Sequence, residues 1–331
     1  MAHAPVGRSP VFLREGTPKD RLGVARGLGG GAAIPESAGD LPLVLHDLLL
    51  KQPPKSTVGA GRTEPFTAGG HVFWWLGPRD GAGRLDSAVG LAGHRVVWPD
   101  DDVRAGIAAA LDLIATRPWA MDLVSTYVTT FALAETERSG TRKGLITSCS
   151  LPDFPLCVFF SPRVFVHIPP LSIHPVDSVR MAAENLYHEA VHQAVNYQLL
   201  AHDILVPEYD SARSPKIPIY WRQSAGEKRN RAWELDRVLH AASVYCHLLH
   251  WRYCELVDPT LDAEERKTVI NATTDSIGAL KSLCDALSEH IDYFTSEGAL
   301  LVGRLIEAAE TRTEVMRTVI QTESIPGTIS K

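Results

Sequence analysis

The sequence lacks any apolar run of about eighteen residues, the length that a membrane-spanning helix requires. It also shows no apolar segment after a basic start near Met1, so we expect neither secretion nor membrane insertion. The chain has no excess of positive charge, because it contains 33 Lys and Arg residues and 39 Asp and Glu residues. No basic stripe indicates contact with phosphates, so we expect no nucleic-acid partner.

Cysteine is scarce, and the five that occur include no Cys-x-x-Cys pair. An odd number of scattered cysteines does not predict a disulfide framework, and it favours free thiols in a reducing compartment. We therefore expect a cytoplasmic protein. With 331 residues, of which 45% are hydrophobic, the chain is long enough to bury a sizeable core.

The composition changes along the chain and predicts its organisation. Residues 1–40 are rich in Gly, Pro and Arg, and we expect a flexible or irregular lead-in. Residues 41–331 are predicted to form a single metalloenzyme domain, with a helical buttress over 41–140, strands and the metal site over 141–257, and C-terminal helices over 258–331. The predicted fold class is α+β, mainly α-helical, with a small β-sheet next to a metal-binding helix.

Several segments carry patterns of secondary structure. The short apolar runs 71–76 and 94–98 predict a small hairpin or two edge strands. Residues 100–135 have helical periodicity with a break at Pro118. Residues 145–170 are expected to be sheet, because 157–160 and 163–168 are rich in β-branched and aromatic residues.

The motif His188-Glu189-Ala190-Val191-His192 organises the sequence, because it falls within a helix predicted over 176–200, which Asp177 or Ser178 can cap. Residues four apart share one face of a helix, so His188 and His192 are placed to bind a single metal ion. Glu189 would then lie beside the open coordination positions. The following stretch 203–230 is polar and rich in proline, and we expect a lid or substrate loop there.

The third metal ligand is expected on a second helix, predicted over 232–257. The candidates there are His240, Glu234, Asp236 and His247. His240 is preferred because Trp233 and Arg237 share its face and could build a pocket. An arginine such as Arg237 or Arg222 can bind a carboxylate through two hydrogen bonds, as a 2-oxoglutarate cosubstrate requires.

The identity of the metal stays open at this level. Three imidazoles suit Zn with one bound water, or Fe(II) with several open positions. In a zinc hydrolase, Glu189 would be the general base, whereas in an iron oxygenase it would more naturally orient a ligand or substrate.

Three segments together resemble a known group of proteins. They are 186–193 (LYHEAVHQ), 220–222 (YWR) and 231–241 (RAWELDRVLHA). Over residues 148–253, the chain resembles the HExxH-containing peptide-modifying proteins of ribosomal peptide natural product biosynthesis, described as 2-oxoglutarate-dependent peptide β-hydroxylases. The resemblance implies Fe(II) and 2-oxoglutarate as cofactors and a precursor peptide as substrate.

HExxH also occurs in zinc peptidases, so a zinc-dependent peptidase or amide hydrolase is the alternative. Two common peptidase signatures are absent after His192, namely a Gly-x-x-His continuation and an Asn-Glu-x-x-Ser-Asp helix. A third possibility is a non-catalytic peptide-binding module with a degenerate or structural metal site.

Overall fold

A computed structural model describes residues 63–78, 93–136, 146–151, 156–223 and 231–323. The lead-in predicted for 1–40 lies outside the described residues. Contacts between Cα atoms divide the chain into two compact units. The first includes 35–167 and 175–201, and the second includes 168–174 and 202–331. Each unit is described by itself, and the single domain over 41–331 stays a prediction.

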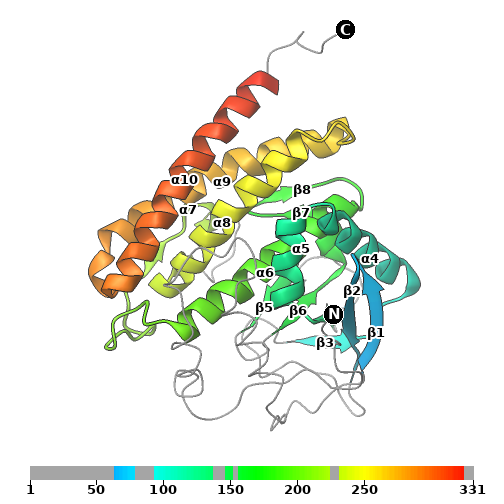
Figure 1. The fold of residues 1–331 in the computed structure, drawn as a ribbon, viewed down its shortest axis with the longest axis horizontal. Coiled ribbons are helices and arrows are strands. Elements are labelled where there is room, and N and C mark those ends of the chain that lie inside the picture. Colours follow the sequence, from blue (N-terminus) through cyan, green and yellow to red (C-terminus); the bar gives the residue numbers. More distant parts are fainter. Residues whose placement is uncertain (1–62, 79–92, 137–145, 152–155, 224–230, 324–331) are drawn as a thin grey trace. The chain divides into compact units, whose positions relative to one another are not determined.

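The described residues are mainly helical and include a small mixed sheet, which confirms the predicted α+β class (Figure 1). The sheet belongs to the first unit, and its strand order is β1-β2-β4-β6-β5, with β3 pairing to β4. The pairs β2–β4 and β4–β6 are parallel, and the other pairs are antiparallel. The strands are β1 (Thr63–Ala68), β2 (His71–Leu76), β3 (His94–Val97), β4 (Thr130–Thr136), β5 (Ser148–Ser150) and β6 (Cys157–Phe160).

The two apolar runs near the N-terminus form strands as predicted, but they do not pair with each other. β2 instead forms a hairpin with β1, and the turn uses Gly69 and Gly70 at φ values of 57° and 78°. Glycine adopts such angles without the steric cost that a side chain would impose. The sequence of β1 mixes polar and apolar residues without strict alternation, which explains why it was not predicted.

The helical prediction for 100–135 is correct only up to Tyr127. Helices α4 (Asp101–Ala115) and α5 (Pro118–Tyr127) are separated as expected, with Pro118 at the first position of α5. The chain then enters β4, the strand in the middle of the sheet. Because β4 is buried on both faces, its apolar residues are nearly continuous, and periodicity does not separate such a run from a buried helix.

The predicted sheet over 145–170 is also only partly correct. Cys157–Phe160 is strand β6, but the strand predicted over 163–168 is correct only at its end, because its first half belongs to the 3-10 helix η1 (Pro162–Phe165) and only β7 (His167–Ile168) is strand. Ser161 explains the turn, since its hydroxyl accepts a hydrogen bond from the Arg163 N–H at 3.2 Å. The strand β8 (Ser172–Ile173) pairs with β7.

The HExxH helix is α6 (Val179–Ala201), close to its predicted bounds. Ser178 caps it, because its hydroxyl oxygen accepts hydrogen bonds from the N–H groups of Arg180 and Met181 at 3.1 and 3.5 Å. In the first unit, α4 and α5 pack against α6.

Asn185 forms hydrogen bonds that connect α6 to η1 and β7, which precede it in the chain. Its amide nitrogen donates to the carbonyl oxygens of Val164, His167 and Met181 at 3.1, 2.6 and 2.9 Å. The side chain is 1% exposed, so water cannot replace these bonds. Asn185 therefore sets the position of η1 and β7 against the helix.

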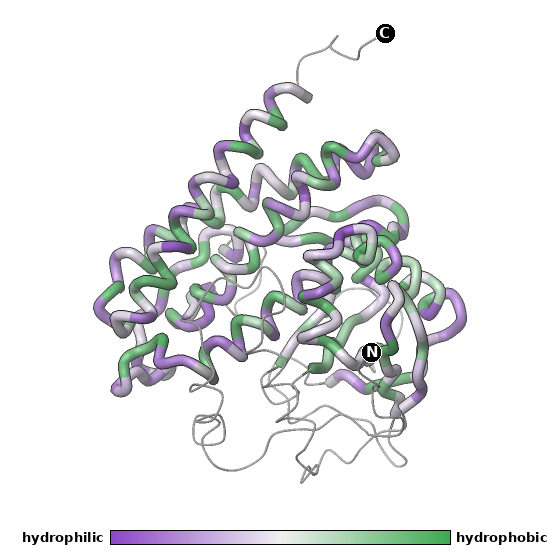
Figure 2. Tube along the Cα trace, in the orientation of Figure 1, coloured by the Kyte–Doolittle hydropathy of each residue, from purple (hydrophilic) through white to green (hydrophobic). Residues whose placement is uncertain are grey.

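The second unit is built on three long helices, α8 (Leu235–Leu256), α9 (Ala263–Glu289) and α10 (Ser296–Glu323). The last two are helices within the predicted range 258–331, and α8 replaces the helix predicted over 232–257. Figure 2 shows apolar and polar residues alternating along them, as expected for helices that bury one face. Before α8 lie β9 (Ile217–Pro218), α7 (Tyr220–Gln223) and β10 (Ala232–Trp233). A lid over 203–230 stays a prediction, and 224–230 lie outside the described residues.

A fully buried guanidinium joins parts of the second unit. Arg252 on α8 donates to the Ala272 carbonyl at 2.9 Å and to the Ser276 hydroxyl at 2.6 Å, both on α9. Its other terminal nitrogen donates to the Pro169 carbonyl at 2.6 Å. These bonds compensate for the desolvation of the charge and connect 168–174 to the helices.

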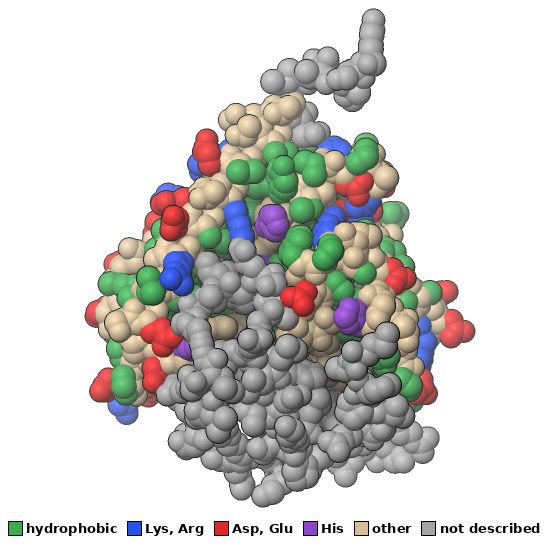
Figure 3. All heavy atoms as spheres, in the orientation of Figure 1, with side chains coloured by type: hydrophobic (Ala, Val, Ile, Leu, Met, Phe, Trp, Pro, Cys, Tyr) green, Lys and Arg blue, Asp and Glu red, His purple; other side chains and the backbone are tan. Residues whose placement is uncertain are grey.

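Charged residues, helices and cysteines in the described part of the chain bear on the expectations drawn from composition. On the face drawn in Figure 3, acidic and basic side chains are interspersed over the described residues. No helix in the described part of the chain is both long and apolar enough to cross a membrane. The five cysteines are free thiols.

We expect Asn185→Ala to lower the free energy of unfolding by about 2–4 kcal/mol, because buried carbonyl groups lose their donor. Urea denaturation measures this change. Asn271→Ala is the matched control, since Asn271 is exposed on α9, and its effect should be within about 0.5 kcal/mol. Equal effects of the two substitutions would contradict this role of Asn185.

Candidate metal centre

Helix α6 brings the two HExxH histidines together. The ring centroids of His188 and His192 are 4.8 Å apart, with an angle of 49° between the ring planes. Both side chains are partly buried. This spacing follows from their separation by four residues, which places them on one face, one turn apart. The pair can supply two nitrogen donors to one ion.

Glu189 does not extend into solvent. It is 3% exposed, and its Oε1 lies 3.8 Å from Nε2 of His188. The hydroxyl of Ser150, on β5, donates to Oε2 of Glu189 and also to the Glu189 backbone carbonyl at 3.1 Å. Ser150 was not predicted as part of the site, because a contact between residues 39 apart has no local signal in the sequence.

Burial raises the pKa of the Glu189 carboxyl to about 7, and hydrogen bonds from the hydroxyls of Ser150 and Ser148 and from the Ser150 N–H oppose this rise. Desolvation disfavours the charged form, whereas donors stabilise it. A carboxyl that titrates near neutral pH beside two histidines is typical of a functional site.

In the second unit, two arginines lie near one indole ring. The guanidinium carbon of Arg237 is 4.8 Å from the ring centroid of Trp233, and that of Arg222 is 5.9 Å from it. Trp233 packs edge-on against Trp221 at 5.7 Å, and Trp221 packs edge-on against Tyr245 at 6.1 Å. The aromatic cluster thus places both predicted carboxylate-binding arginines on one support.

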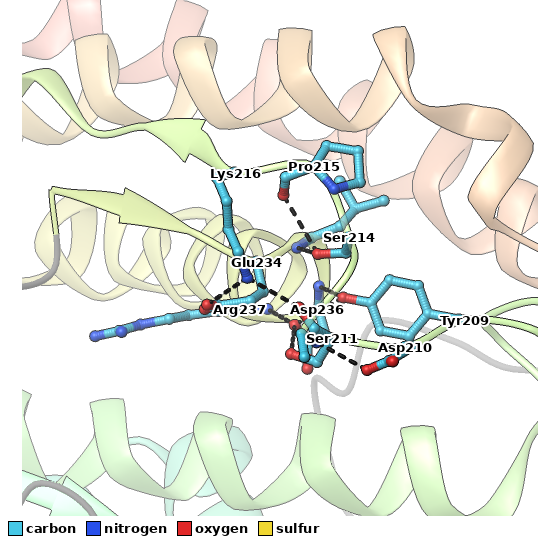
Figure 4. A network of polar contacts seen from close by, with 11 residues as sticks. Tyr209, Asp210, Ser211, Ser214, Pro215, Lys216, Glu234, Asp236 and Arg237 are labelled. Carbon is cyan, nitrogen blue, oxygen red and sulfur yellow. Dashed lines mark hydrogen bonds and ion pairs between the residues drawn. The ribbon is translucent and has the colours of Figure 1, made fainter.

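Two of the alternative third ligands have other partners (Figure 4). Glu234 forms an ion pair with Lys216 at 2.8 Å, and the hydrogen bond from Lys216 is the main cause that lowers the pKa of Glu234. Asp236 accepts hydrogen bonds through Oδ1 from the Tyr209 hydroxyl at 2.9 Å and the Arg237 N–H at 2.9 Å. Figure 4 shows Arg237 extending away from this network.

Both histidine candidates on α8 are kept neutral by their surroundings. Burial lowers the pKa of His240 to about 4, with Asp236 opposing and Arg237 adding to the effect. Burial lowers the pKa of His247 to about 3, and Arg312 and His250 add to it. Neutral imidazole is the form that binds a metal.

Glu234 and Asp236 are engaged by the partners just described, and burial keeps the imidazole of His240 neutral. His188 and His192 belong to the first unit, however, and His240 belongs to the second. Among the described residues, no group of three or more His, Cys, Asp or Glu side chains is arranged to hold a metal ion. His240 as the third ligand therefore stays a prediction.

Comparisons with known proteins add no relative, since no family model matches the chain and no curated protein is significantly similar to it. The resemblance to peptide β-hydroxylases depends on the motifs alone.

We expect Glu189→Gln to stabilise the metal-free protein more at pH 8 than at pH 5. The raised pKa of Glu189 means that the folded state binds more protons than the unfolded state between about pH 4.5 and 7, so stability is lost as the pH rises through this window. Above it, the loss is about 3 kcal/mol. Urea denaturation at both pH values should show the stabilisation growing by about 2 kcal/mol.

Glu208→Gln is the matched control for this measurement, because Glu208 is exposed. It should change the free energy of unfolding little at either pH. An equal stabilisation by Glu189→Gln at pH 5 and pH 8 would contradict this expectation. That result would show that burial does not raise the pKa of the Glu189 carboxyl.

Proposed function

We propose that this chain is a metal-dependent peptide-modifying enzyme, which hydroxylates a β-carbon in a ribosomally made peptide. The reaction would use Fe(II), 2-oxoglutarate and O2. The paired rings of His188 and His192 support a metal centre, and the motif resemblance supports the peptide substrate. A cytoplasmic location, expected from the composition, belongs to the same proposal.

His188, His192 and His240 would hold the iron as neutral imidazole donors, and Glu189 would orient the His188 ring. Arg237 or Arg222 would bind the far carboxylate of 2-oxoglutarate. When bound, Fe(II) with this cosubstrate supplies oxidation of an unactivated C–H bond, and the protein contributes binding and orientation.

The pair of arginines at Trp233 is the observation that carries the preference for an oxygenase. Arg237 and Arg222 both lie within 6 Å of one ring centroid, so the two guanidinium groups share one aromatic support. Guanidinium groups bind carboxylates with two parallel hydrogen bonds, so either arginine could bind a carboxylate of a dicarboxylate cosubstrate. A zinc hydrolase has no chemical requirement for such a pair.

One observation favours a zinc-dependent peptidase or amide hydrolase as the second candidate. A carboxyl with a pKa of about 7 is well matched to a general base at neutral pH. In that reaction, Glu189 would take a proton from a water bound at the metal. The two candidates thus assign Glu189 different roles at the same helix.

Metal and cosubstrate dependence separates these candidates. The protein is loaded with Fe(II) or with Zn, given a precursor peptide encoded beside its gene, and the peptide mass is measured. We expect a gain of one oxygen atom only with Fe(II), 2-oxoglutarate and O2. Cleavage under anaerobic conditions with Zn would instead establish hydrolysis. Full function in both His188→Ala and Glu189→Ala would indicate a non-catalytic binding module.

We expect Arg237→Ala and Arg222→Ala to weaken 2-oxoglutarate binding by about tenfold to a hundredfold, since a charge-assisted hydrogen bond contributes about 1.5–3 kcal/mol. Equilibrium binding of 2-oxoglutarate to the metal-loaded protein measures the loss. Arg213→Ala is the control, because the Arg213 side chain is 88% exposed. If both test variants bind 2-oxoglutarate as tightly as the original protein, neither arginine belongs to the cosubstrate site.

A further inference from the structure

Strand β5 ends the sheet within the described residues, where only β6 pairs with it. The N–H of Ser161 donates to the Thr147 carbonyl at 3.0 Å and extends this antiparallel ladder. Pairs that exchange hydrogen bonds alternate with pairs that do not. Thr147 and Cys149 therefore direct their backbone groups toward β6, and Ser148 and Ser150 direct theirs to the open side.

The carboxylate of Glu189 meets this open side. The hydroxyl of Ser150 donates to Oε2, and the Ser148 hydroxyl and the Ser150 N–H are close enough to lower the pKa of the carboxyl as donors. A carboxylate that is 3% exposed needs such donors, because burial without them costs several kcal/mol (about 2–7 for a neutral polar group alone). Successive residues of a strand face opposite sides, so the Cys149 side chain is directed away and packs at the cluster of Leu76, Val96, Ala132, Cys157 and Phe159.

The same helix face carries two further anchors. Asn185 and Gln193 lie four residues before and after Glu189, and both are 1% exposed. Gln193 donates to the Cys157 carbonyl at 3.1 Å, and Asn185 donates to those of Val164 and His167. These three polar residues fix the rotation of α6 about its axis. Glu189 is the middle one, and it is the one of the three with a carboxylate side chain.

We propose that Ser148 and Ser150 are positioning residues for the metal centre. They hold Oε2 of Glu189 at the edge of β5, so that Oε1 stays 3.8 Å from Nε2 of His188 and keeps a carboxylate charge beside the ring that would bind the metal. The inference rests on the proposed function only in requiring that His188 binds a metal. A carboxylate a few ångströms from a cation stabilises the bound ion by its opposite charge.

The experiment measures Co(II) binding by titration of the full-length protein, followed by its visible absorption spectrum. We expect Ser150→Ala to weaken Co(II) binding about tenfold and the double variant with Ser148→Ala to weaken it further, up to about a hundredfold. The spectrum of bound Co(II) should also change. Ser150→Thr keeps a hydroxyl and should restore affinity and spectrum to near the original values.

Cys149→Ala is the matched control on the same strand, because its side chain faces away from Glu189, and it should bind Co(II) like the original protein. Unchanged affinity and spectrum in Ser150→Ala would overturn the proposal. If that variant does not fold, Ser148→Ala and Ser150→Thr decide it by the same readouts. His188→Ala tests the metal centre separately: Co(II) binding that persists unchanged there would refute the proposed function itself.

Discussion

The polar stripe on the inner face of α6 is the constraint on which the candidate site depends. Asn185, Glu189 and Gln193 recur every four residues, and each is bonded to backbone or hydroxyl groups of 147–167. A purely apolar face would allow small rotations of the helix at little cost, whereas directional bonds to buried carbonyls do not. His188 and His192 lie one position before Glu189 and Gln193, so their direction is set by the same bonds.

The sequence predicted the parts of this arrangement that have a local cause. The length of α6, its cap at Ser178 and the pairing of His188 with His192 all follow from helical spacing and capping chemistry. The strand β4 was assigned to a helix, because a strand buried on both faces has no alternating pattern. The role of Ser150 had no local signal either, because its partner lies 39 residues away and only the folded sheet brings them together.

The second unit shows the same division between local and tertiary information. Trp233, Arg237 and His240 were selected by helical spacing, but α8 begins at Leu235, three residues after its predicted start, and Trp233 lies in β10 before the helix. The contacts between the preceding loop and the first turn of α8 were not predicted. The Tyr209 hydroxyl accepts a hydrogen bond from the Asp236 N–H at 3.1 Å, a group that has no partner within the helix. The network of Figure 4 therefore fixes the first turn, from which Arg237 extends.

The burial of Glu189 makes the folded state less stable whenever its carboxyl is ionised. Its burial raises the pKa to about 7, so the ionised form makes folding less favourable at neutral pH. A divalent cation beside His188 would reverse this effect, because an opposite charge a few ångströms away stabilises the carboxylate. Metal binding would then offset the loss in folding free energy that the buried carboxylate causes. A glutamine would fill the same space without the charge, and it would give up this coupling between carboxylate and cation.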